Sequence, residues 1–119
     1  MAYDPNNIFA KILRGEVSCD KAHESVHTFA FYDIAPQAPI HILVVPKGAY
    51  IDIADFSENA TTEEQVDFFQ SVAKIVKENK LTHQGFRSIT NSGRDAGQEV
   101  PHFHLHLLGG KKMGEMLSS

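Results

Sequence analysis

The chain of 119 residues lacks the features of a disulfide-stapled secreted protein and of a strongly charged one. Its single cysteine, Cys19, has no partner for an internal disulfide bond, which indicates a reducing compartment. Its formal net charge of −4 gives no general attraction to nucleic acid or to an anionic membrane surface. We therefore expect no nucleic-acid partner.

Long apolar runs are also missing. The longest candidate, residues 40–46, is far shorter than the roughly 20 residues of a membrane-spanning helix, and it contains His41. The N-terminal sequence MAYDPNNIFAKILRGE carries acidic and polar residues where a signal peptide has an apolar run. These absences predict a cytoplasmic protein without a membrane partner. The composition, 42% hydrophobic and 22% charged, is typical of a folded chain, and residues 1–119 are expected to form a single domain.

Two stretches have the spacing of amphipathic helices. The first is short, with apolar residues that begin behind Asn7, a helix-capping residue type, and with Gly15 as its end point. The second covers residues 62–79, and its start is marked by a capping-box pattern of Thr61 and Glu64.

Four further stretches are predicted to be strands, from alternation or from their content of β-branched residues. They are residues 27–33, 40–45 and 85–91, and the segment from His102 to the glycine pair at 109–110. Because few crossover connections are available, we expect an α+β protein with a mainly antiparallel sheet and its helices on one face.

The last predicted strand contains HFHLHLL at residues 102–108, which places three of the seven histidines at alternate positions. Side chains alternate between the two faces of a strand, and alternate residues are about 7 Å apart along it. One face is therefore predicted to carry His102, His104 and His106. The other carries Phe103, Leu105 and Leu107, which can pack beneath the helices.

Three interpretations of these histidines stay open from the spacing alone. The first is a solvated strand face that tolerates histidine. The second is a zinc site completed by His41, although no carboxylate or second cysteine lies close by in the sequence. The third is nucleophilic catalysis, in which a neutral imidazole attacks phosphorus through one nitrogen while its other nitrogen is held as a donor.

The loop ahead of the histidines favours the third interpretation. Residues 91–99, NSGRDAGQE, are rich in turn formers, and Gly93 and Gly97 let backbone N–H groups approach an anion. A plain hairpin loop explains this stretch equally well when it is taken alone. Directly before three histidines, we interpret it as a cradle for a phosphate group.

The His-x-His-x-His pattern followed by Leu107 and Leu108 resembles the signature of the histidine triad (HIT) family. Residues 97–100, GQEV, resemble the family's Gly-Gln-x-Val, and residues 31–47 resemble a second block of the family. NIFAKILRGE resembles its N-terminal helix, and the ending LGGKKMGEMLSS resembles the tail of bacterial members of the Hint branch. The resemblance therefore covers nearly the whole chain.

The resemblance implies a HIT fold, with a five-stranded antiparallel sheet, one short and one long helix, and pairing with a second copy in a homodimer. It also implies a nucleotide hydrolase that splits the P–N bond of adenosine or guanosine 5′-phosphoramidates. The products would be the nucleoside monophosphate and an amine, formed through a nucleotidyl-histidine intermediate. No metal or other cofactor is expected. The alternatives are a dinucleoside polyphosphate hydrolase with the same triad, and a regulatory protein that binds nucleotide and turns it over slowly.

The resemblance also assigns roles to residues. His104 is the expected nucleophile, His102 holds its ring through a main-chain carbonyl, and His106 and His41 orient or polarise the phosphate site. The expected nucleotide-binding residues are Asp33 at the ribose, Ile34 beside the nucleoside, and Asn91, Gly97, Gln98, Glu99 and Val100 toward the phosphate.

Some of these residues have structural alternatives. Asp33 is also suited to cap a turn, His41 to be a satisfied core histidine, and Asn91 to be a turn residue at a strand end. Glu99 departs from the Ser or Thr that many relatives carry, which leaves the leaving-group preference open and points toward cationic amines. His106, as a third histidine, indicates hydrolysis rather than nucleotidyl transfer.

Overall fold

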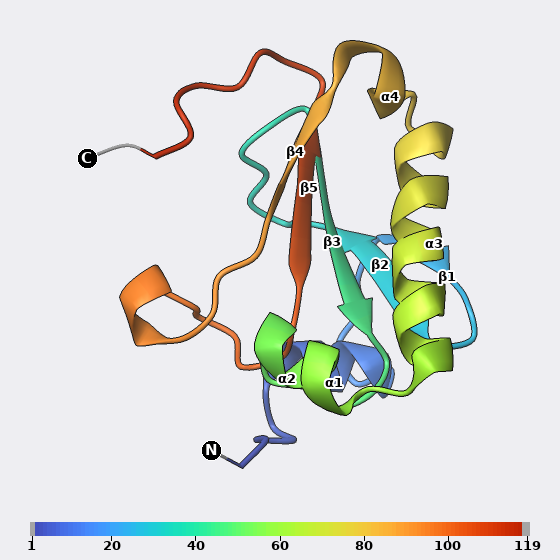
Figure 1. Cartoon of the computed structure of the whole chain (residues 1–119), viewed down its shortest axis with the longest axis vertical. Coiled ribbons are helices and arrows are strands. Elements are labelled where there is room, and N and C mark those ends of the chain that lie inside the picture. Colours follow the sequence, from blue (N-terminus) through green and yellow to red (C-terminus); the bar gives the residue numbers. More distant parts are fainter. Residues whose placement is uncertain (1, 118–119) are drawn as a thin grey trace.

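The computed structural model describes residues 2–117, which form a five-stranded antiparallel sheet with helices on both faces (Figure 1). The strands lie in the order β1-β2-β3-β5-β4, and every neighbouring pair is antiparallel. The predicted α+β class and five-stranded sheet are confirmed. The strands are β1 (Lys21–Glu24), β2 (Thr28–Tyr32), β3 (Ile40–Pro46), β4 (Phe86–Ile89) and β5 (Leu105–Gly109).

The two predicted helices form, and both are capped as the sequence suggests. They are α1 (Ile8–Leu13) and α3 (Thr62–Glu78). The Asn7 side chain accepts a hydrogen bond from the Ala10 N–H at 2.9 Å, and Thr61 and Glu64 form the reciprocal capping box. No helix within residues 2–117 is long and apolar enough to cross a membrane.

Three short elements were not predicted from the sequence: strand β1 and the helices α2 (Ile53–Asn59) and α4 (Leu81–Gln84). Each is too short to show a clear period of apolar residues. Strand β1 is an edge strand whose outer residues are exposed, so it has little apolar content to mark it.

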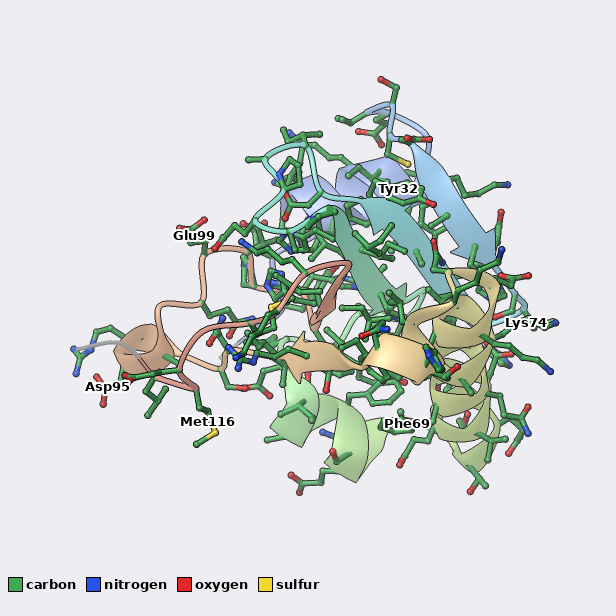
Figure 2. All side chains as sticks on the ribbon, turned by 90° about the horizontal axis from the view of Figure 1, so that it is seen from above. Tyr32, Phe69, Lys74, Asp95, Glu99 and Met116 are labelled. Carbon is green, nitrogen blue, oxygen red and sulfur yellow. The ribbon has the colours of Figure 1, made fainter. Side chains whose placement is uncertain are left out.

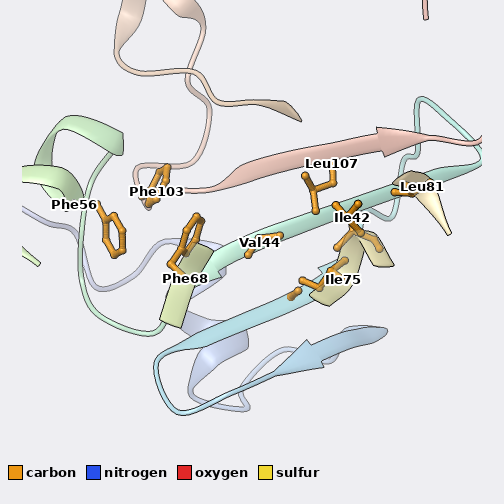
Figure 3. Close-up of a cluster of buried hydrophobic side chains, with 10 residues drawn as sticks. Ile42, Val44, Phe56, Phe68, Ile75, Leu81, Phe103 and Leu107 are labelled. Carbon is orange, nitrogen blue, oxygen red and sulfur yellow. The ribbon is translucent and has the colours of Figure 1, made fainter. Parts of the chain in front are cut away.

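The larger part of the core lies between the sheet and α3 (Figure 3). The rings of Phe56, Phe68 and Phe103 stack against one another with centroids 5.1–5.2 Å apart. Leu107 from β5 is also fully buried in this cluster. Because Phe103, Leu105 and Leu107 pack toward this core, the alternate residues His104 and His106 are turned to the opposite face of the sheet.

A second apolar cluster covers that opposite face. It consists of Phe9 from α1 with Phe31, Leu43 and Val45 from the sheet. The prediction that all helices lie on one face is therefore wrong, because α1 packs on the face opposite α3. As a result, the Phe9 ring stands edge-on to the ring of His104, with centroids 4.9 Å apart.

The histidine stretch itself begins differently from the prediction. Strand β5 starts at Leu105, and the residues before it form a turn in which the His102 N–H donates to the Val100 carbonyl at 2.9 Å. The next N–H, of Phe103, donates to the Tyr50 carbonyl at 2.7 Å. The His102 side chain therefore does not lie in line with those of His104 and His106, as it would in a continuous strand, and it is fully buried.

Candidate functional site

A cavity of about 410 Å³ opens on the face of the sheet that carries α1. Strands β3 and β5 lie side by side in its floor, because Leu43 pairs with His106 and His41 pairs with Leu108 across the two strands. The structure brings most of the predicted site residues together here: the wall contains His41, His104, His106, Asp33, Asn91, Gly97, Gln98, Glu99 and Val100.

The orientation of His104 is fixed by one hydrogen bond. Its Nδ1 lies 2.7 Å from the main-chain carbonyl oxygen of His102. A carbonyl oxygen only accepts, so Nδ1 carries the proton and Nε2 of the neutral ring keeps its lone pair. His104 is 8% exposed, and it reaches solvent only at the cavity that it lines. The ring therefore presents an unprotonated nitrogen as its remaining polar atom.

The ring of His102 serves a different purpose, since it does not line the cavity. Its Nε2 donates to the Pro46 carbonyl oxygen at 2.9 Å, and its Nδ1 lies 2.6 Å from the hydroxyl of Tyr3. Both ring nitrogens are therefore occupied inside the protein, and the residue contributes to the site through its main chain.

His41 and His106 form a relay behind His104. The backbone N–H of Gln37 donates to His41 Nδ1 at 3.1 Å, so the proton of the neutral His41 ring is on Nε2. This Nε2 lies 2.9 Å from His106 Nδ1 and donates to it. The proton of neutral His106 is then on Nε2, where it is available as a donor to a ligand in the cavity. His41 is buried, yet it belongs to the site through this bond.

Asp33 divides its two carboxylate oxygens between a turn and the site. Oδ1 accepts the backbone N–H of Ala35 at 2.8 Å, which is the turn-capping role, and Oδ2 lies 3.4 Å from His41 Nε2. Turn capping through Oδ1 and ligand binding through Oδ2 are therefore compatible, because the two oxygens have different neighbours.

One cluster of metal-ligand types is present among residues 2–117: Asp33, His41 and His106, with ligand atoms within 4.8 Å of one another. A metal on Nε2 of neutral His41 requires the proton on Nδ1. In the structure, however, Nδ1 accepts from the Gln37 N–H. If a metal bound Nε2 and the proton moved to Nδ1, that N–H and the Gln37 N–H would be two donors facing each other. The hydrogen-bond pattern of the cluster therefore fits a proton relay and does not fit a metal centre.

The loop before the triad is held in shape by Gln98. Its side-chain amide donates to the carbonyls of Ile51 and Val100 at 2.7 and 3.0 Å, and its Oε1 accepts the Gly93 N–H at 2.9 Å. The N–H groups of Gly97 and Gln98 are also bonded within the loop, at 3.0 Å each. The proposed phosphate cradle is therefore not formed by these amides. Among the described residues, the N–H groups of Glu99 and Val100 donate to no protein acceptor.

Glycine is required at two positions of this loop. Gly93 and Gly97 have φ angles of +78° and +72°, a region that disfavours side chains. The expectation that glycines shape this loop is correct. The loop residues that line the cavity are Gly97, Gln98, Glu99 and Val100, and of these Glu99 and Val100 have the N–H groups that the loop itself does not bond.

Some predictions differ in detail and some contacts were missed. Ile34 is 99% exposed and is not part of the cavity wall, so in the single chain it forms no apolar wall.

Phe9 and Gln37 line the cavity without having been predicted. The hydroxyl of Thr90 donates to the His104 carbonyl at 2.8 Å. None of these contacts has a local sequence signal.

Burial keeps the three triad histidines neutral. It lowers the pKa of His102 to about 4, and burial with the neighbouring His104 and His41 lowers the pKa of His106 to about 4. Burial also lowers the pKa of His104, against the opposing effects of the bond to His102 and the charges of Asp33 and Glu99. An unprotonated Nε2 on His104 is thus available at neutral pH.

The fold and the arrangement of these imidazoles define a histidine triad protein. The chain belongs to the HIT family: the family's HIT domain matches residues 14–113. It is 50% identical to an uncharacterised HIT-like protein of Azospirillum brasilense over 116 residues, which are 98% of this chain and 95% of the relative.

Two further similarities concern proteins with a stated activity. The chain is 41% identical to the purine nucleoside phosphoramidase of Escherichia coli over 112 residues, 93% of this chain and 92% of the relative. A solved structure of a HIT family hydrolase from Clostridium thermocellum superposes with a TM-score of 0.86 at 34% identity, covering 94% of this chain and 97% of that one.

The buried neutral histidines predict how stability depends on pH. The folded-state pKa values of His102 and His106 lie below the ordinary value of 6.5, so the unfolded chain binds protons that the folded chain does not. The free energy of unfolding should therefore decrease as the pH falls from about 6.5 toward 4. Urea unfolding at about pH 7 and about pH 5 measures this decrease.

Two variants separate the contribution of one ring. His106→Asn should lose less stability over this pH interval than the unchanged protein, because it no longer carries this half-buried imidazole with its lowered pKa. His83→Asn, at an exposed position in α4, should behave as the unchanged protein. An equal loss in all three proteins would contradict the assignment of the pH dependence to the buried ring.

Proposed function

We propose that this protein is a purine nucleoside phosphoramidase, which hydrolyses the P–N bond of adenosine or guanosine 5′-phosphoramidates. The observation that carries the proposal is the 2.7 Å hydrogen bond from His104 Nδ1 to the His102 carbonyl, because it leaves Nε2 unprotonated at the cavity. The 41% identity to a purine nucleoside phosphoramidase supports the choice of bond.

The first step is an in-line displacement at the α-phosphorus. Nε2 of His104 forms a bond to phosphorus, and the P–N bond of the substrate breaks with its electron pair passing to the amine nitrogen, which takes up a proton. The His104 ring then carries the positive charge, which the carbonyl of His102 stabilises through the Nδ1 proton. The Nε2–H of His106 donates to a phosphoryl oxygen and offsets its negative charge.

The second step returns the enzyme to its starting state. Water attacks the phosphorus of the nucleotidyl adduct and loses a proton, the bond between phosphorus and Nε2 breaks, and neutral His104 is regenerated. The proton lost by water balances the proton taken up by the amine. Oδ2 of Asp33, the oxygen that does not cap the turn, would accept the ribose hydroxyls, and the N–H groups of Glu99 and Val100 would donate to phosphate oxygens.

Removal of the nucleophile tests this mechanism. His104→Ala should lower kcat for adenosine 5′-phosphoramidate by at least about 10³-fold, since no other group in the cavity can form the adduct. The control His83→Ala, at an exposed position outside the cavity, should keep full activity. AMP release is followed in the presence of a chelator.

The same assay separates the alternatives. If the intact protein releases no AMP from the phosphoramidate but cleaves a dinucleoside polyphosphate, the hydrolase belongs to the other branch. Activity that His104→Ala retains would contradict the proposed nucleophile.

Glu99 bears on the choice of leaving group. It lies in the wall of the cavity and also in the wall of a neighbouring hollow of about 790 Å³. That hollow is lined further by the carboxylates of Asp52, Asp55 and Glu58 and by the guanidinium of Arg94. A carboxylate repels phosphate, so we propose that Glu99 contacts the amine side of the substrate and favours an amine with a second positive charge.

A pair of matched substrates measures this preference. The adenosine 5′-phosphoramidates of 1,4-diaminobutane and of butylamine differ only in a terminal ammonium group. The ratio of their kcat/KM values should favour the diamine and should fall about five- to tenfold in Glu99→Gln. Asp95→Asn removes a charge from the same loop at a position that lines neither hollow, and it should leave the ratio unchanged (Figure 2). An unchanged ratio in Glu99→Gln would contradict the role.

We also propose that the chain forms a homodimer. Val66 and Phe69 are 48% and 56% exposed on one side of α3, and Phe86 and Ile89 are 40% and 37% exposed on β4. Strand β4 is an edge of the sheet, so its outer backbone groups are free to pair among the residues described. A second copy is the partner that would cover these surfaces in a protein of this family.

A charge placed on α3 tests the dimer. Phe69→Glu should shift the protein from dimer to monomer, because in the dimer the new carboxylate would be buried in the apolar contact between the two copies. Lys74→Glu changes charge on a different side of α3 and should leave the dimer intact (Figure 2). Sedimentation equilibrium gives the mass of each protein. A monomeric unchanged protein would overturn the proposal.

A further inference from the structure

The N-terminal segment folds back over the first histidine of the triad. The hydroxyl of Tyr3 lies 2.6 Å from His102 Nδ1, although 99 positions separate the two residues, and their rings stand edge to face with centroids 5.6 Å apart. A local turn places Tyr3 there: the Asn7 side chain donates to the Asp4 carbonyl at 2.7 Å, and the Asn6 N–H donates to the Asp4 carboxylate at 2.9 Å.

The direction of the Tyr3 hydrogen bond follows from the other nitrogen of the His102 ring. Nε2 faces the carbonyl oxygen of Pro46 and must carry the proton, so Nδ1 of the neutral ring accepts from the Tyr3 hydroxyl. His102 is 0% exposed. Without the hydroxyl, Nδ1 would be a buried acceptor with no donor, and the ring would lose one of its two anchors.

The anchored ring belongs to the residue whose carbonyl orients His104. The peptide group between His102 and Phe103 is held at its oxygen by His104 Nδ1, at 2.7 Å, and at its N–H by the Tyr50 carbonyl, also at 2.7 Å. A shift of the His102 ring would therefore move the oxygen that selects the His104 tautomer and aims its Nε2.

We propose that Tyr3 is a positioning residue for the nucleophile: by donating to His102 Nδ1, it holds the His102 carbonyl where His104 requires it. The proposal rests on the proposed role of His104 in phosphoramidate hydrolysis. Tyr3 does not line the cavity and has no contact with a bound nucleotide to lose. Its effect on the reaction passes through His102 alone.

A single hydroxyl deletion tests this role. Tyr3→Phe keeps the ring and its edge-to-face contact, and it should lower kcat about tenfold while KM changes less than about twofold. Tyr32→Phe is the matched control, because Tyr32 lies on β2 and packs against the core on the α3 face (Figure 2). It should change neither constant. Equal kinetics of Tyr3→Phe and the unchanged protein would overturn the proposal.

A double-mutant cycle shows whether the effect passes through His102. His102→Phe removes both ring nitrogens but leaves the main-chain carbonyl. In that background, Tyr3→Phe should cause no further loss of kcat. A further tenfold loss would show that Tyr3 supports the fold in general, and it would overturn the positioning role.

The hydrogen bond of His104 can also be observed without substrate. The Nδ1 proton of His104 should exchange with solvent roughly tenfold faster in Tyr3→Phe than in the unchanged protein or in Tyr32→Phe, measured by proton NMR. Unchanged exchange would overturn the proposal. This measurement needs no turnover. If the protein fails to hydrolyse phosphoramidates, the proposed function is overturned, but the exchange rate still tests whether Tyr3 positions His104.

Discussion

The site depends on the hydrogen bond between His104 Nδ1 and the carbonyl oxygen of His102. An imidazole has two nitrogens, and only the one without a proton can act as a nucleophile. The acceptor lies two residues before the ring, in the irregular segment that precedes β5. The turn at Val100–His102, the burial of His102 and the start of the strand at Leu105 all serve this one contact.

Each imidazole around the cavity has a partner that fixes its proton. Tyr3 and Pro46 hold His102, and Gln37 holds His41, which in turn fixes His106. A buried ring with an unpaired nitrogen would destabilise the fold, and a charged one would do so more. The arrangement therefore keeps the rings neutral and leaves a single strong acceptor, Nε2 of His104, at the cavity that solvent and ligand can enter.

The alternation of HFHLHLL correctly predicted the side on which four of its side chains lie. Phe103 and Leu107 lie in the core, and His104 and His106 line the cavity. His102 did not follow, because a hydrogen bond to Pro46, 56 positions away, draws its ring out of the row. Such distant contacts leave no local pattern: Tyr3 and Thr90 reach the triad in the same way. The role of Gln98 also depends on the position of Ile51, which the sequence does not reveal.

The proposed mechanism requires His104 Nε2 to form a bond to phosphorus during the reaction. Rapid acid-free quenching of the protein with adenosine 5′-phosphoramidate, followed by mass spectrometry of the peptide that contains residues 102–108, tests it directly. A nucleotidyl group attached to Nε2 of His104 should appear before AMP is released. AMP release with no adduct, or an adduct on another histidine, would contradict the proposed nucleophile.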